Sequence, residues 1–146
     1  MTQEEILALI KREVVPAIGC TEPMCVALCV AYATEALGGG TPDSIHVSLS
    51  ANVLKNAMGV GIPGTGMVGL PIAIALGALI GKTSYQLEVL HDCTPEAVQQ
   101  GQQLIASGCI HIELEKNACD NLYVDVVCKK GNHRSETIIA LSLIHI

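Results

Sequence analysis

Two segments of this chain carry residue types that can do chemistry: a cysteine at the start of an expected helix and a loop rich in glycine. Cys20 stands just before Thr21, which can cap a helix that has Pro23 in its first turn. The free amides and the dipole of a helix N-terminus lower the pKa of a thiol placed there. We therefore expect Cys20 to be a thiolate, the form that binds iron or attacks an electrophile.

The other cysteines show no spacing typical of a metal site. Cys20, Cys25 and Cys29 follow a C-x4-C-x3-C pattern, which matches neither a common zinc site nor a ferredoxin. Cys25 and Cys29 lie one helical turn apart in an apolar stretch, so we expect both to be small buried hydrophobic residues. The chain has 7 cysteines and an acidic N-terminus without a signal-peptide pattern. This favours a reducing cytoplasm, where thiols or metal ligands are more common than disulfides.

The glycine-rich loop spans residues 59–69 and contains one hydroxyl, at Thr65. It satisfies the dinucleotide fingerprint G-x-G-x-x-G twice, but the segment 51–58 separates it from the preceding strand and no acidic strand end follows. A nicotinamide cofactor is therefore disfavoured. The backbone amides around Gly64, Thr65 and Gly66 can instead hold a carboxylate, or the glycines can simply permit tight packing.

Apolar spacing and turn residues predict the elements that position these segments. We expect an amphipathic helix over 3–15 behind a capping box, then helices over 21–38, 71–80 and 94–108. Alternating residues predict strands over 44–50, 110–114, 122–127 and 136–140. The last three strands follow one another through turns, so we expect a small antiparallel sheet. Helices and strands are segregated along the chain, which indicates the α+β class.

Overall composition narrows the classes of protein further. The 146 residues are 50% apolar and lack Phe and Trp, so they can form one domain with a core of small aliphatic side chains. A formal net charge of −6 would repel a phosphate backbone, which argues against nucleic-acid binding. The uncharged stretch between Lys55 and Lys82 is broken by glycine and proline, and its continuous part over 67–80 is too short to span a membrane.

Two of the expected helices, over 21–38 and 71–80, are apolar on almost every side. Such helices must be surrounded by protein. We expect 146 residues to provide too little protein surface to cover both helices. Poor solubility or self-association is therefore predicted, and a homo-oligomer is one form that this self-association can take.

The last six residues, 141–146, do not fit the rest of the chain. Their sequence, Leu-Ser-Leu-Ile-His-Ile, matches the peptide encoded by an adapter used in DNA library preparation. We interpret this segment as a non-native scar and residues 1–140 as the domain. The alternative is an ordinary C-terminal strand held by the sheet.

Three motifs together resemble the N-terminal part of the L-cysteine desulfidase family, which is related to the α-chain of iron–sulfur L-serine dehydratases. The motifs are Gly19-Cys20-Thr21-Glu22-Pro23 and the segments 52–60 and 63–71. The resemblance covers residues 5–140. It implies a serine dehydratase α-chain-like fold and an oxygen-sensitive [4Fe-4S] lyase, free of pyridoxal phosphate, that converts L-cysteine to pyruvate, ammonia and sulfide.

The resemblance also implies roles for particular residues. Of the three cysteines that hold the cluster in this family, only Cys20 has a match here, and the other ligands are expected in a C-terminal portion outside this chain. The fragment alone is therefore expected to be inactive.

Our hypothesis for the substrate is that Gly64, Thr65 and Gly66 hold its carboxylate, with Asn56 as a further polar contact. Lys55 is a candidate base if burial lowers its pKa, and otherwise an ordinary surface lysine. Two other functions stay open: an L-serine dehydratase, and a non-catalytic module that binds a small carboxylate.

Overall fold

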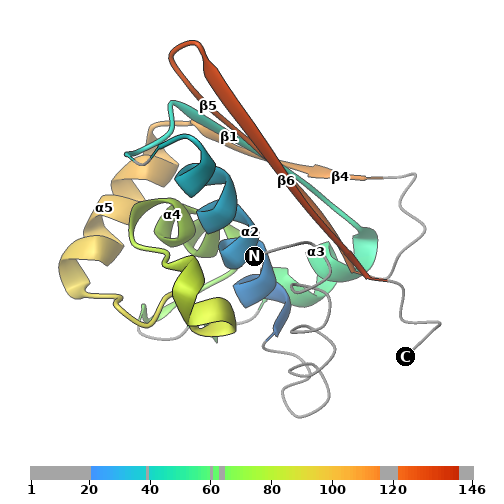
Figure 1. The fold of residues 1–146 in the computed structure, drawn as a ribbon. Coiled ribbons are helices and arrows are strands. Elements are labelled where there is room, and N and C mark those ends of the chain that lie inside the picture. Colours follow the sequence, from blue (N-terminus) through green and yellow to red (C-terminus); the bar gives the residue numbers. More distant parts are fainter. Residues whose placement is uncertain (1–20, 39, 60, 63–64, 116–121, 142–146) are drawn as a thin grey trace.

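The fold is a four-stranded mixed sheet with helices packed on one of its faces, together with a small separate hairpin (Figure 1). The computed structural model describes residues 21–38, 40–59, 61–62, 65–115 and 122–141. In chain order the elements are α2 (Thr21–Ala36), β1 (Ser44–Leu49), α3 (Ala51–Met58), β2 (Gly61–Ile62), β3 (Met67–Val68), α4 (Leu70–Leu79), the 3-10 helix η1 (Thr83–Glu88), α5 (Pro95–Ala106), β4 (Ile110–Leu114), β5 (Leu122–Lys130) and β6 (His133–Leu141). The α+β class expected from the sequence is confirmed.

The sheet has the strand order β4-β1-β5-β6, and its pairing corrects one expectation. Strand β1 pairs with β5, and β5 with β6, in antiparallel fashion. Strand β1 pairs with β4 in parallel, Val47 opposite Ile112, so the sheet is mixed rather than antiparallel. The physical reason is the long connection from β1 to β4 through α3, α4 and α5, because a parallel pair needs such a crossover.

Side chains alternate between the two faces of the sheet, as the period-two sequence pattern predicts. On β1, Ile45, Val47 and Leu49 are fully buried on the face that carries the helices. Strand β5 continues this buried row with Val124 and Val126. The intervening residues of both strands are only half-buried.

The two apolar helices α2 and α4 pack against each other and form the centre of the core. Helix α2 contacts α4, β5 and β6, and α4 also contacts α5 (Figure 1). The helices approach closely at Gly77, where an added Cβ would lie 2.6 Å from the carbonyl oxygen of Ala27. The expectation that this chain cannot cover both helices was wrong, because the sheet, α5 and η1 cover them. The oligomeric state itself stays a prediction.

The ends of the helices and strands show which sequence signals predicted the structure correctly. Helix α5 begins as predicted, because Thr94 Oγ1 accepts a hydrogen bond of 3.2 Å from the amide of Ala97. Helix α3, the hairpin β2–β3 and η1 were not predicted. The expected helix 3–15 and residues 142–146 lie outside the described residues, while Leu141 pairs with Leu122 as the last residue of β6. Within the described ranges, no helix is long and apolar enough to cross a membrane.

Candidate functional site

The described residues of the three sequence motifs lie on neighbouring elements: the first turn of α2, α3, and the turn that leads into α4. Helix α2 contacts α3. Met24, in the second turn of α2, packs against the core cluster that contains Ile62 of the hairpin and Ile72 of α4. The turn before α4 reaches α3 at Gly69, where an added Cβ would lie 3.0 Å from the carbonyl oxygen of Met58. Segments far apart in the sequence therefore form one structural unit.

The glycine-rich loop is a short hairpin that leads directly into the N-terminus of α4. Gly66 and Gly69 have φ values of +68° and +95°, a region that side chains disfavour, so these two glycines shape the turn. Gly69 precedes the helix without a side-chain cap. Pro71 has no N–H, so the amides of Leu70, Ile72 and Ala73 are the ones in this first turn that could donate to an acceptor such as a carboxylate. Gly64 lies outside the described residues.

Thr65 holds this hairpin together through its hydroxyl. Thr65 Oγ1 accepts a hydrogen bond of 2.9 Å from the amide of Met67 and donates to the carbonyl oxygen of Ile62 at 2.7 Å. The hydroxyl hydrogen is thus already committed within the loop. To donate to a bound carboxylate, Thr65 would have to release Ile62, so its first role is to set the shape of the loop.

Lys55 and Asn56 lie on α3, the neighbouring helix, and both are exposed. Asn56 Nδ2 donates a long hydrogen bond of 3.4 Å to Asn52 Oδ1 one turn earlier. A role for Lys55 as a base would require its side chain to be buried. In the structure this side chain is exposed. Either residue could reach a substrate only as part of an exposed rim beside the hairpin.

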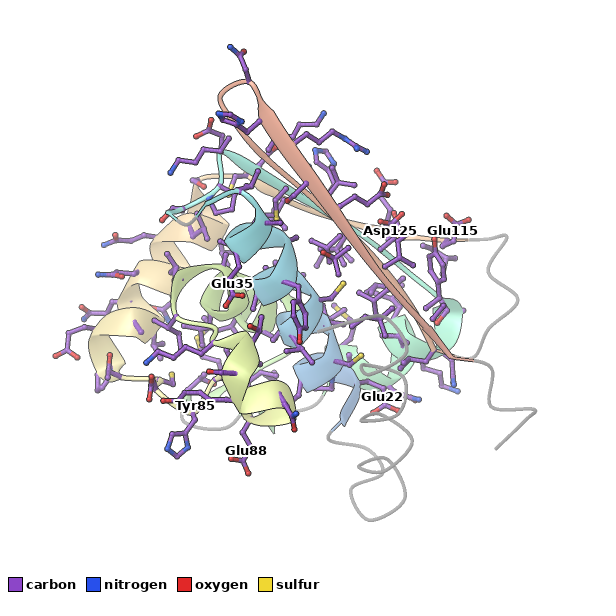
Figure 2. All side chains as sticks on the ribbon, viewed as in Figure 1. Glu22, Glu35, Tyr85, Glu88, Glu115 and Asp125 are labelled. Atoms are coloured by element: carbon purple, nitrogen blue, oxygen red, sulfur yellow. The ribbon has the colours of Figure 1, made fainter. Side chains whose placement is uncertain are left out.

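Glu22, in the first turn of α2, is a candidate that sequence reasoning missed. Its Oε2 atom is buried and has no hydrogen-bond partner among the described residues. Figure 2 shows Glu22 at the end of α2 that lies beside α3. An acidic residue in a first helical turn is ordinary, because it complements the helix dipole. The residue type therefore did not single out Glu22 within its motif, because burial of its carboxylate cannot be deduced from the sequence.

The cysteines after Cys20 in α2 are buried thiols, as predicted. Cys25 and Cys29 are fully buried. Burial, followed by the charge of Glu22, raises the pKa of Cys25 to about 12, and burial also raises that of Cys29 well above its usual value. Cys29 Sγ donates to the carbonyl oxygen of Thr137 at 3.2 Å, which ties α2 to β6. Neither group is a thiolate available to a metal.

The described residues do not by themselves provide a site for an iron–sulfur cluster. Cys20, the one expected ligand, lies outside the described residues. Among those that are described, no group of three or more His, Cys, Asp or Glu side chains could hold a metal ion. Cys25, Cys29 and Cys128 are buried, and Cys93 and Cys109 are half-buried. A cluster bound at Cys20 would therefore need ligands from outside this set.

Comparison with known proteins finds relatives over most of the chain. A UPF0597 protein of Bacteroides fragilis is 62% identical over 138 residues, which cover 94% of this chain and 32% of that protein. The UPF0597 proteins of Bacteroides thetaiotaomicron and Porphyromonas gingivalis are 61% and 47% identical over the same length. The chain spans about a third of the length of these curated relatives. No family model and no solved structure matches it.

Proposed function

Because this chain carries UPF0597-family sequence over nearly its whole length, we propose that it forms about a third of an iron–sulfur lyase that degrades L-cysteine to pyruvate, ammonia and sulfide. The observation that carries the proposal is that the described residues of the three motifs lie on neighbouring elements, near the first turns of α2 and α4. These motifs are the ones that resemble the L-cysteine desulfidase family. A cytoplasmic location belongs to the same proposal.

The hairpin and α4 supply the part of this chemistry that the described residues can perform. Elimination from L-cysteine requires the substrate carboxylate to be held still while the α-proton and the β-thiolate leave. The helix N-terminus behind Gly69 offers amides and a favourable dipole for that carboxylate. The turn at Gly66 leaves room beside it because no side chain projects there. Asn56 and Lys55 form the neighbouring exposed rim.

The cluster belongs to the longer chain rather than to this part of it. When bound, a [4Fe-4S] cluster with one open iron supplies a Lewis acid. Cys20 would contribute one ligand, and the other cysteines would come from the two thirds of the protein that this chain does not span. The fragment alone is expected to lack the cofactor.

The first test replaces Cys20 in the full-length protein that contains this sequence, purified without air. We expect Cys20→Ser to lower the iron and acid-labile sulfide content and the broad visible absorbance of the cluster. Cys93→Ser is the matched control, because Cys93 is a half-buried cysteine outside the motifs. Full iron content in Cys20→Ser would refute the ligand assignment.

Product analysis of the same full-length protein separates the three functions. Sulfide, ammonia and pyruvate formed from L-cysteine support the proposed lyase. Pyruvate and ammonia formed from L-serine alone would instead show a serine dehydratase. Binding of these amino acids without any product, in a protein that carries no cluster, would show a non-catalytic carboxylate-binding module.

The hairpin is tested through Thr65. Thr65→Ala removes the hydroxyl that bonds both Ile62 and Met67, so the loop should lose its shape and the KM for L-cysteine should rise. Thr65→Ser keeps the hydroxyl and is expected to retain the KM of the unmodified enzyme. Unchanged steady-state kinetics in Thr65→Ala would remove this residue from the site.

A further inference from the structure

Glu22 brings a partly buried negative charge to the first turn of α2. The residue lies two positions after Cys20, and its Oε2 atom is buried without a hydrogen-bond partner among the described residues. Glu22 as a whole is only half-buried, so it is not sealed inside the core. A buried carboxylate oxygen without a donor is costly, so the donor is expected from outside the described residues.

The described basic side chains do not supply this donor. Lys82 Nζ lies 2.7 Å from Asp92 Oδ2, and Arg134 Nη2 lies 3.7 Å from Glu136 Oε1. None of the lysines and arginines within the described ranges forms an ion pair with Glu22. Two sources of a donor therefore compete: a cation from the remainder of the longer protein, and a positively charged group of the bound substrate.

The position of Glu22 fits the second charge of an amino acid. Among the residues of the three motifs, Glu22 is the only acidic one. Helix α2 contacts α3, and α3 meets the turn into α4 where Met58 approaches Gly69. The amides in the first turn of α4 are the expected partners of the substrate carboxylate. An amino acid carries its ammonium group on the carbon next to the carboxylate, so the partner of that ammonium group must lie near these amides.

We propose that Glu22 binds the α-ammonium group of the substrate while the first amides of α4 hold its carboxylate. An ammonium group supplies N–H donors and a positive charge, so it provides both the hydrogen bond and the counter-charge that Oε2 lacks. Holding both groups fixes the α-carbon between them, which orients the α-proton and the β-sulfur for elimination. The identity of the substrate rests on the proposed lyase function, whereas the preference for an amino acid over the same acid without its amino group rests on Glu22.

Steady-state kinetics test this role with two ligands that differ only in the amino group, L-cysteine and β-mercaptopropionate. In the full-length protein, purified without air, we expect Glu22→Gln to raise the KM for L-cysteine roughly 10- to 100-fold, as for the loss of a hydrogen bond between charged groups. The inhibition constant of β-mercaptopropionate should stay unchanged. Glu96→Gln is the matched control, because Glu96 is also an acid in a first helical turn, that of α5, and is exposed. Equal weakening of both ligands by Glu22→Gln, or no change in either, would refute the proposal.

Equilibrium binding separates this role from the lyase activity. L-alanine and propionate also differ by one amino group, and neither has a β-leaving group, so calorimetric titration of the full-length protein needs no turnover. We expect the unmodified protein to bind L-alanine roughly tenfold or more tightly than propionate, and Glu22→Gln to remove this preference. If L-cysteine gives no products but this preference depends on Glu22, the lyase proposal fails and the ammonium site stands. An unmodified protein without the preference would overturn the ammonium site.

Thermal unfolding without ligand tests the competing source, an Arg or a Lys from the remainder of the longer protein. If the carboxylate is unpaired until substrate binds, Glu22→Gln removes an uncompensated buried charge, and the Tm of the ligand-free full-length protein should stay the same or rise. If a cation already pairs with Glu22, the same substitution leaves that cation uncompensated and lowers the Tm. Glu96→Gln corrects for the lost interaction with the helix dipole. A clearly lower Tm in Glu22→Gln than in Glu96→Gln would therefore refute the proposal.

Discussion

Replacing Gly77 by alanine tests the central packing claim, that α2 and α4 approach at backbone distance. In the interior of an unstrained helix, Gly→Ala adds about 1 kcal/mol of stability. At Gly77 the new Cβ would lie 2.6 Å from the carbonyl oxygen of Ala27 and 3.2 Å from its carbonyl carbon and Cα. These atoms are backbone, so they cannot turn aside as a side chain can.

The cost of this substitution follows from the need to separate two buried helices. Inserting a methyl group into a well-packed core costs about 1–3 kcal/mol, and contact with rigid backbone places Gly77→Ala near the upper end. After subtracting the gain in helix propensity, we expect a net loss of about 2 kcal/mol. For a domain of this size that corresponds to a fall of about 4–8 °C in Tm.

Gly101→Ala in α5 is the matched control. Its nearest neighbour would be the Cδ1 atom of Ile72 at 3.0 Å, the end of a flexible side chain, followed by side-chain atoms at 3.5 and 3.6 Å. We expect this variant to be between neutral and about 1 kcal/mol more stable than the unmodified chain. Urea unfolding followed by circular dichroism measures both. Equal stabilisation by the two substitutions would refute the close approach of α2 and α4.

Three further predictions concern single side chains of the 146-residue chain. Burial, followed by the neighbouring Glu136, raises the pKa of Asp125 from 3.8 to about 6, so the folded protein holds a proton that the unfolded chain releases, and stability should fall as pH rises through this window. Asp125→Asn removes that loss and, after allowance for solvent screening, should stabilise the chain by about 1 kcal/mol at neutral pH. Urea unfolding of both proteins below the pKa of 3.8 and above that of about 6 checks this. A difference in stability between the two proteins that does not change with pH would contradict it. Thr94→Ala removes the cap on the Ala97 amide and should cost about 0.5–2 kcal/mol in a thermal melt, whereas Thr94→Ser should not. Ser135→Ala removes the 2.6 Å bond that Ser135 Oγ donates to the carbonyl oxygen of Ala33, and a loss of about 1 kcal/mol is expected; an unchanged unfolding midpoint would show that this bond does not hold β6 to α2.

The sequence predicted those elements whose signals are local and strong. Helix α5 has Thr94 as its cap and Gly108, with φ +80°, just after its end. Strand β1 shows a clear period of two. Helix α3 was missed because only Val53 and Ala57 of its eight residues are buried, too short a stripe to distinguish it from a loop.

The remaining features depend on contacts between distant residues. The parallel pairing of β1 with β4 cannot be deduced from either strand alone, since it follows from the path of the chain through three helices. In the candidate site, the position of the glycine-rich loop before a helix was correctly anticipated. The internal bonds of Thr65, the exposure of Lys55 and the buried oxygen of Glu22 all depend on how that loop and α3 pack.

The crossover between β1 and β4 also affects how this protein emerges from the ribosome. Helix α2 ends at residue 36, but β5, which covers its apolar side in the sheet, begins only at residue 122. At roughly 5–20 residues per second, synthesis of that interval takes on the order of 4–17 s. During this time α2 can pack against α4 and η1, but β5 and β6 cannot yet cover its other side. The nascent chain should therefore depend on a chaperone, and its yield should respond to chaperone levels more than that of a domain built from consecutive hairpins.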